Sequence, residues 1–258
     1  MTESTALPAG CHTALVTGGT SGLGLAMATA LAQAGLRVAV AGRSPDRAAA
    51  AADRLPGAFG VELDVRDTES VARGVQQAWD RLDGIQLLVN NAGLGMRTVN
   101  PRFLTEPAGF WTVPPDGFRE VIATNLTGYF LVAREVTPRM LAAGGGRIVN
   151  ISMNYATMTR SGFVPYGPSR AGAEALSRIM AADLRGTTVT VNQLLPGGAT
   201  RTGMVPVEAA GRAGLLEPEI MADPITWLAS AQAAGVHDER IVATEFAGWL
   251  SDRAARVS

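Results

Sequence analysis

The stretch TALVTGGTSGLG, residues 13–24, decides how this chain folds. Its first five residues are mostly β-branched or aliphatic, which predicts a short buried strand. Glycines at 18, 19, 22 and 24 predict a sharp turn, and the apolar segment from Gly22 onward predicts a helix. Glycine lets a backbone approach a pyrophosphate closely, and a helix N-terminus presents oriented N–H groups and partial positive charge. Between a first strand and a helix, this turn predicts a dinucleotide-binding α/β domain.

Short aliphatic runs alternate with longer amphipathic or alanine-rich segments along the rest of the chain. This alternation is typical of repeated βα units around a parallel sheet. We predict strands at 13–17, 37–41, 60–63, 85–90, 147–151, 188–194 and 240–243. Helices are predicted at 22–34, 45–55, 68–82, 115–143, 165–184 and 217–234. We therefore expect one α/β domain over 1–258, a Rossmann-type doubly wound parallel sheet with helices on both faces, with a flexible N-terminus at 1–11.

The composition argues against several classes of protein. With 258 residues, 47% of them hydrophobic, and a formal net charge of −1, the chain can bury one large core. A lone Cys11 and two histidines, His12 and His237, provide no cluster for a metal ion. No apolar run reaches the roughly 18 residues of a membrane span, and the polar start lacks a signal-peptide pattern. Because the charge is balanced, no nucleic-acid footprint is present, and we expect a soluble, cytoplasmic protein.

All 22 basic residues are arginine, and the sequence contains no lysine. A Schiff-base aldolase or a pyridoxal phosphate enzyme needs a lysine amine, so both chemistries are excluded. A Ser-His-Asp hydrolase is disfavoured because His12 directly precedes the first predicted strand and His237 stands in a polar segment near the C-terminus. We expect both histidines to be structural or exposed.

The glycine turn has the form TGxxxGxG, and further motifs follow it in a fixed order. Asp64-Val65 follows the third predicted strand, Asn91-Ala92-Gly93 follows the fourth, Asn125 stands in a predicted helix, and Pro196-Gly197 follows the sixth strand. In this order and spacing the chain resembles the short-chain dehydrogenases/reductases over essentially its whole length. The resemblance implies an oxidoreductase that uses a nicotinamide dinucleotide.

The resemblance also implies which residues surround the cofactor. They are Gly18, Thr20, Ser21, Gly22, Leu23, Gly24, Arg43, Ser44, Asp64, Val65, Asn91, Ala92, Gly93, Pro196, Gly197 and Thr202. The second predicted strand is followed by Gly42 and Arg43, where an NAD-specific site would place an acidic residue on the ribose hydroxyls. Arg43 can instead pair with a 2′-phosphate, so we predict NADP(H); an ordinary loop charge is the alternative. Asn91 and Gly93 equally fit a buried turn.

In this family an active-site tyrosine precedes a lysine by four residues, and Tyr166 and Arg170 occupy these places. The i, i+4 spacing puts both side chains on one face of a helix. A fixed positive charge beside a phenol favours the phenolate, so Tyr166 could donate a proton to a carbonyl or imine as hydride arrives. Arginine is longer and planar and cannot relay a proton, so the exchange is not conservative. By resemblance Asn125 would complete a proton relay through water, although it could also satisfy nearby backbone.

The serine that the family places before its tyrosine is displaced in this chain. The corresponding position is Met153, and Ser152 stands one residue earlier. Neighbouring residues of a strand point to opposite faces, so Ser152 is expected to aim away while Met153 occupies the oxyanion-binding position. A local bulge that turns Ser152 back, or Asn154 as the donor, is the alternative.

The segment between Gly93 and Asn125 is longer than is usual in the family and carries Phe103, Phe110 and Trp111. Loops after strand C-termini build the substrate pocket of such sheets, so we expect an apolar substrate, although these residues could instead pack the loop or form a subunit contact. The leading hypothesis is an NADPH-dependent reductase of a ketone, aldehyde or C=N group. The alternative is an NADP-binding protein with little redox activity, either a regulatory or scaffold subunit or a non-redox catalyst. By resemblance we expect a homodimer or homotetramer.

Overall fold

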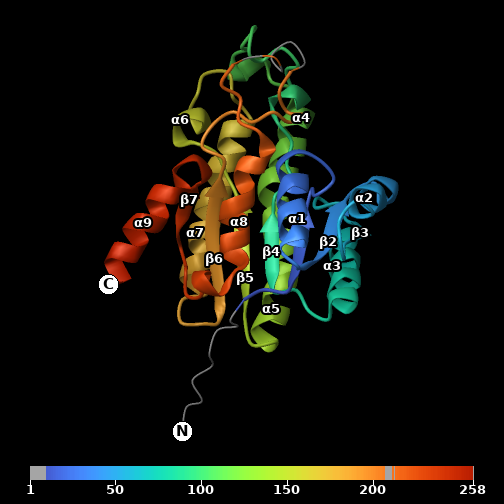
Figure 1. The fold of residues 1–258 in the computed structure, drawn as a ribbon. Helices are drawn as coiled ribbons and strands as arrows, with labels where there is room; N and C mark the ends of the chain where they lie inside the picture. The colour runs from blue at the N-terminus through green and yellow to red at the C-terminus, as the bar shows by residue number, and fades with distance from the viewer. Residues whose placement is uncertain (1–9, 207–210, 212, 258) are drawn as a thin grey trace.

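The computed structural model describes residues 10–206, 211 and 213–257. Within them, seven parallel strands form one sheet in the order β3-β2-β1-β4-β5-β6-β7 (Figure 1). The strands are β1 (Thr13–Thr17), β2 (Arg37–Gly42), β3 (Phe59–Glu62), β4 (Leu87–Asn90), β5 (Gly146–Ile151), β6 (Val189–Leu195) and β7 (Arg240–Val242). The strand order reverses between β1 and β4, where doubly wound sheets bind ligands beyond the carboxyl ends of their strands. The predicted fold class is confirmed.

Helices cover both faces of the sheet (Figure 1). On one face the buried core includes side chains of α1 (Gly22–Gln33), α2 (Pro45–Ala52), α8 (Ala222–Ala229) and α9 (Phe246–Val257). On the other it includes side chains of α3 (Thr68–Leu82), α5 (Gly128–Ala142) and α7 (Tyr166–Asp183). The central strands β1, β4, β5 and β6 are buried throughout, as expected for a parallel sheet between two helical layers. A polar site is therefore expected at the edge formed by the carboxyl ends of the strands, where α4 (Pro115–Ile122) and α6 (Tyr155–Met158) lie.

One predicted helix was wrong in its continuity, and another is continuous but contains a π-helical turn. The helix predicted at 115–143 consists of α4, a π-helical segment η3 (Ala123–Thr127) and α5. The helix predicted at 217–234 consists of η5 (Pro218–Met221), α8 and η6 (Ala231–Ala233). It breaks because Ser230 is extended and its hydroxyl accepts from the Gln232 amide. Helix α9 was not predicted, and further 3-10 segments are η1 (Met96–Thr98), η2 (Phe110–Thr112) and η7 (Ala243–Glu245).

The start of the chain is described only from Gly10 onward. Residues 1–9, most of the segment predicted to be flexible, lie outside the described residues. Cys11 is buried and its amide donates to the Ala229 carbonyl at 2.8 Å, so this residue is anchored against α8. Across the described part of the chain, no helix combines the length and apolarity needed to cross a membrane. Nor do histidine, cysteine and carboxylate side chains gather there into a group that could hold a metal ion.

Candidate active site

The glycine turn after β1 is shaped by contacts that only glycine permits. Gly18 and Gly22 have φ of 61° and 54°, in the left-handed region that disfavours side chains. A Cβ on Gly24 would lie 2.3 Å from the Gly18 carbonyl oxygen and 2.4 Å from Asn91 Nδ2. Ser21 stands at the N-cap of α1, and its side chain makes no capping hydrogen bond. The backbone of Gly18, Gly22 and Gly24, here called the glycine cradle, and the amides at the start of α1 therefore form a site that fits a pyrophosphate.

The turn after β4 locks this cradle to the centre of the sheet. Asn91 Nδ2 donates to the Thr17 and Gly18 carbonyls at 3.0 and 3.1 Å. The amides of Asn91 and Ala92 both donate to Thr17 Oγ1, at 3.0 and 3.2 Å. The Asn91 side chain therefore braces the two turns against each other.

Arg43 and Asp64 follow the carboxyl ends of β2 and β3, and they lie close enough for their charges to interact. Arg43 is exposed, and Gly42 beside it packs so closely on Thr20 that a Cβ would lie 2.8 Å from Thr20 Cγ2. Asp64 pairs with Arg66 at 2.6 Å. The hydrogen bonds from Arg66 hold the pKa of Asp64 below its usual range, and the charge of Arg43 adds to this effect.

The remaining residues expected around the cofactor have mainly local roles in the structure. Ser44 caps α2 by accepting from the Arg47 amide at 3.3 Å. Val65 is buried against Gly128, where a Cβ would lie 2.7 Å from Val65 Cγ2. Thr202 lies over the glycine cradle, since a Cβ on Gly22 would be 3.2 Å from its methyl group.

After β6, Pro196 and Gly197 form a turn against the segment that follows β7. The Thr244 amide donates to the Pro196 carbonyl at 3.3 Å. Gly197 has φ of 96°, and a Cβ there would lie 2.0 Å from Thr244 Oγ1. Both residues therefore stand where the backbone leaves the sheet and leads towards Thr202.

Tyr166 and Arg170 share one face of α7, as their spacing predicts. Tyr166 is half-buried, and its hydroxyl lies 4.0 Å from Met204 Sδ. Arg170 is only 3% exposed, and its guanidinium carbon lies 5.5 Å from the centroid of the Tyr166 ring. Burial opposes the charge of Arg170, but the phenols of Tyr129 and Tyr166 outweigh it and raise the pKa of the guanidinium. A fixed cation therefore lies beside Tyr166.

Tyr129 is the neighbour of Arg170 that sequence analysis missed. Arg170 Nη1 donates to the Tyr129 hydroxyl at 2.6 Å and to the Ile151 carbonyl at 3.0 Å. On the other side of the guanidinium, a Cβ on Gly93 would lie 2.4 Å from Arg170 Nη2. Burial raises the pKa of Tyr129, so its hydroxyl stays protonated near neutral pH. No family motif covers Tyr129, and only its place four residues after Asn125 in the same predicted helix hinted at a shared face.

Asn125 lies in the π-helical segment η3 and is fully buried. Its Oδ1 accepts from the Leu94 amide at 2.7 Å, and its Nδ2 donates to the Leu94 carbonyl and to Ser169 Oγ, both at 2.9 Å. The side chain therefore anchors the loop after β4 to α7. This is the backbone-satisfying alternative that the sequence left open.

The structure turns Ser152 towards Glu174. Ser152 Oγ donates to Glu174 Oε1 at 2.5 Å. Glu174 follows Tyr166 by eight residues on α7, about 12 Å along the helix axis, so the hydroxyl is drawn away from the phenol. Asn154 Nδ2 donates instead to the Gly197 carbonyl at 2.8 Å.

Two further residues missed in the sequence, Glu174 and Arg240, hold this arrangement in place. Arg240 pairs with Glu174 at 3.0 Å, and its Nη2 donates to the Met153 carbonyl at 2.8 Å. The Arg240 guanidinium carbon also lies 3.8 Å from the centroid of the Tyr155 ring. These contacts hold the segment 152–155 in place, and Met153 within it is almost entirely buried.

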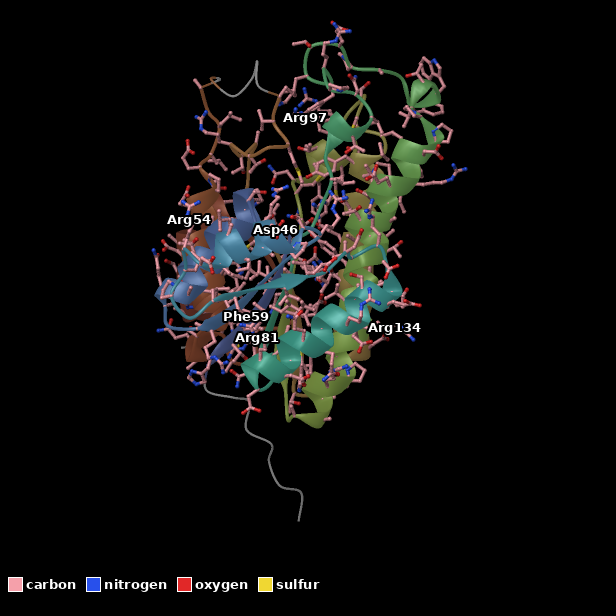
Figure 2. All side chains as sticks on the ribbon, turned by 90° about the vertical axis from the view of Figure 1, so that its right-hand side faces the viewer. Asp46, Arg54, Phe59, Arg81, Arg97 and Arg134 are labelled. Carbon is pink, nitrogen blue, oxygen red and sulfur yellow. The ribbon has the colours of Figure 1, made fainter. Side chains whose placement is uncertain are left out.

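The loops beyond the carboxyl ends of the strands bring apolar and cationic side chains together. Arg97, near the top of Figure 2, donates to the Gly203 carbonyl at 2.7 Å and so links two loops. Phe103 and Phe163 pack edge to face at 5.6 Å. These loops also border a hollow of about 390 Å³, which is lined by Phe110, Val113, Pro115, Phe118, Arg119 and Val164. The Arg160 guanidinium carbon lies 5.0 Å from the centroid of the Phe163 ring, and Arg201 pairs with Glu217.

Comparison with known proteins shows which family the chain resembles. A family model described as short chain dehydrogenase matches residues 12–212. The chain is 36% identical over 188 residues to a 3-oxoacyl-acyl-carrier-protein reductase of Aquifex aeolicus, covering 71% of this chain and 72% of that protein. It is 33% identical over 242 residues to an acetoacetyl-CoA reductase of Rhizobium meliloti, covering 89% and 95%.

Among solved structures, a gluconate 5-dehydrogenase from Burkholderia cenocepacia in complex with NADP and tartrate has a TM-score of 0.78 and 26% identity. The match covers 90% of this chain and 92% of that chain. The family model spans well over half of the sequence. The chain therefore belongs to the short-chain dehydrogenase family of oxidoreductases.

Proposed function

We propose that the chain is an NADPH-dependent reductase of a ketone, aldehyde or C=N group in an apolar small molecule. One observation carries the proposal: the half-buried phenol of Tyr166 lies beside the buried cation of Arg170, whose Nη2 lies against Gly93 at the end of β4. NADPH, when bound, supplies the hydride. The glycine cradle, the start of α1 and this cation lie along one edge of the sheet and fit such a cofactor.

In this mechanism the chain itself manages the proton. Tyr166 donates its hydroxyl proton to the substrate oxygen or nitrogen while hydride adds to the adjacent carbon, so the product is an alcohol or an amine. Arg170 stabilises the phenolate that remains, and its burial strengthens this interaction because little water screens it. Arginine cannot pass on a proton, so a new proton must reach Tyr166 by another route.

The preference for NADPH rests on Arg43. It is exposed next to Gly42, and Asp64 has its own partner in Arg66, so the guanidinium of Arg43 is available to a 2′-phosphate. The similar gluconate 5-dehydrogenase was solved with NADP, which supports the assignment. The two reductase relatives support carbonyl reduction as the reaction class.

Among the three proposed substrate groups we favour the C=N group. The Ser152 hydroxyl is engaged by Glu174, so it is not presented to a developing oxyanion. An imine nitrogen is more basic than a ketone oxygen, so it takes the Tyr166 proton more readily and needs less stabilisation of developing negative charge than a ketone does. The apolar side chains around Phe103 and Phe163 favour an apolar or aromatic substrate.

A second candidate is a cofactor-binding protein with little redox activity. The engagement of Ser152 by Glu174 and of Asn125 by Leu94 favours it, because both side chains are committed to structural hydrogen bonds. Following NADPH absorbance with matched apolar ketones, aldehydes and cyclic imines separates the candidates. Turnover supports the reductase, with imines expected to react fastest. NADPH binding without turnover of any class supports the second candidate, and absence of binding overturns both.

A further inference from the structure

We propose that Tyr129 is the positioning residue that makes arginine usable at position 170. Tyr129 and Arg170 would then act as a pair that holds a cation at the reacting centre. The inference rests on the proposed function and adds a residue that no motif identifies. The Arg170 guanidinium carbon lies 5.6 Å from the Tyr129 ring centroid and 5.5 Å from that of Tyr166, so one cation is in reach of both phenols.

Tyr129 and Ile151 fix one end of the guanidinium. Arg170 Nη1 donates to the Tyr129 hydroxyl and to the Ile151 carbonyl, and the Tyr129 hydroxyl donates to the same carbonyl at 3.1 Å. All three groups are buried, and Tyr129 is only 1% exposed. Hydrogen bonds in such low-dielectric surroundings are strengthened and face little competition from water. This triangle therefore sets the position of Nη1.

The fixed end determines where the other end lies. Nη2 lies against Gly93, which has no side chain to obstruct it. Nε is buried and has no hydrogen-bond partner among the residues that the structure describes. Because the guanidinium is planar and rigid, holding Nη1 directs Nη2 to the Gly93 turn, where the proposed nicotinamide ribose would lie.

A lysine at this position would not need Tyr129. Its ammonium is a compact charge whose donors rotate freely, whereas a guanidinium is longer and presents donors in a fixed plane. The extra length of Arg170 takes Nη1 into the interior, where the Tyr129 hydroxyl supplies an acceptor. Phenylalanine at 129 would leave Nη1 with the Ile151 carbonyl alone, and the guanidinium would be less firmly held.

A double-mutant cycle tests the pair. Tyr129→Phe, Arg170→Lys and the double variant are compared with the parent for NADPH affinity by fluorescence titration, for turnover, and for melting temperature. In the parent, Tyr129→Phe is expected to weaken NADPH binding and turnover by about tenfold, the effect of losing one hydrogen bond to a charged group. In the Arg170→Lys background the same change should alter both by less than about twofold, because the hydroxyl then has no guanidinium to hold.

Ser177→Ala is the matched control, since Ser177 Oγ is another buried hydroxyl and accepts from Asn150 Nδ2 at 2.8 Å. It should lower the melting temperature and leave NADPH affinity unchanged. An equal loss from Tyr129→Phe in both backgrounds, or a lower melting temperature with unchanged binding and turnover, would overturn the pairing and leave Tyr129 a packing residue. Failure of the proposed function shows separately, as a parent protein that does not bind NADPH.

Discussion

At the scale of a single residue, the proposed function assigns the proton transfer to Tyr166, and removing its hydroxyl oxygen isolates that role. We predict that Tyr166→Phe lowers turnover by about 10²–10⁴-fold, the usual contribution of a general acid, while NADPH affinity stays within about twofold. Steady-state rates and a fluorescence titration measure the two effects. Tyr155→Phe is the control, because Tyr155 is 58% exposed and its ring contact with Arg240 survives the change. Full activity in Tyr166→Phe would show that another group donates the proton.

In the proposed function, Arg43 decides the choice of cofactor, and this role can be tested in the same local way. We predict that the parent binds NADPH at least tenfold more tightly than NADH, a difference of about 1.4 kcal/mol, because a guanidinium pairs strongly with a phosphate. Arg43→Ala should remove the preference by weakening NADPH alone. Arg73→Ala is the control, since Arg73 is 72% exposed in a surface ion pair with Glu69. Equal affinities of the parent for the two cofactors would make Arg43 an ordinary loop charge.

Asp64 gives a pH-dependent prediction. Hydrogen bonds from Arg66 hold its pKa below the ordinary value, so the ion pair contributes stability above the unfolded pKa of about 3.9 and loses it as pH falls through the lower, folded pKa. Asp64→Asn should therefore melt at a lower temperature than the parent at neutral pH, and the difference should shrink in acid. Thermal unfolding from pH 7 downward measures it, and a difference that is constant with pH would contradict the ion-pair account.

At the scale of an element, Arg147 of β5 holds the end of helix α8. Its Nη1 donates to the carbonyls of Leu228 and Ser230, both at 2.6 Å, and the residue is 5% exposed. A cation at a helix C-terminus is favourable, and buried carbonyls left without a donor are costly. We predict that Arg147→Met lowers the free energy of unfolding by about 3 kcal/mol in urea titration. The exposed Arg185→Met should change it by less than about 0.5 kcal/mol, and a similar value for both would remove the capping role.

The strands and most helices could be predicted because their signals are local. Every predicted strand overlaps one in the structure, since aliphatic runs bounded by turn residues need no tertiary information. The π-helical segment η3 could not be predicted, because it lies where Asn125 reaches across to Leu94, a contact between distant parts of the chain. Helix α9 did have a local signal, with Phe246, Trp249 and Leu250 at helical spacing, and it was overlooked.

The site shows the same division between local and distant information. The family motifs were enough to predict Tyr166, Arg170 and the glycine cradle, because each of these belongs to a short motif within one stretch of the sequence. Alternation along a strand predicted that Ser152 turns away, but its partner Glu174 comes from another helix. Tyr129 was missed for the same reason: its contact with Arg170 joins α5 to α7, and only its four-residue spacing from Asn125 hinted at a shared face.

At the scale of the whole molecule, the outer surface of one helical layer indicates how copies of the chain could associate. Phe130 and Leu141 of α5 and Ile179 of α7 are 44%, 41% and 58% exposed. Single exposed apolar residues are common, but several on helices of one layer are typical of an interaction surface. Symmetric pairing of such a surface would give the homodimer expected by resemblance, and the homotetramer would need a second interface as well.

We predict that the parent chain, of 26.8 kDa, has two or four times that mass in light scattering at micromolar concentration. Ile179→Glu should halve the mass, to one chain from a dimer or to two chains from a tetramer, because a carboxylate buried in an apolar interface has no partner and is costly to desolvate. Trp111→Glu is the matched control, since Trp111 is 77% exposed in the loop before α4, outside these helices, and should keep the assembly. A parent that scatters as one chain would remove the assembly, and dissociation by Trp111→Glu alone would move the interface to the loops above the sheet.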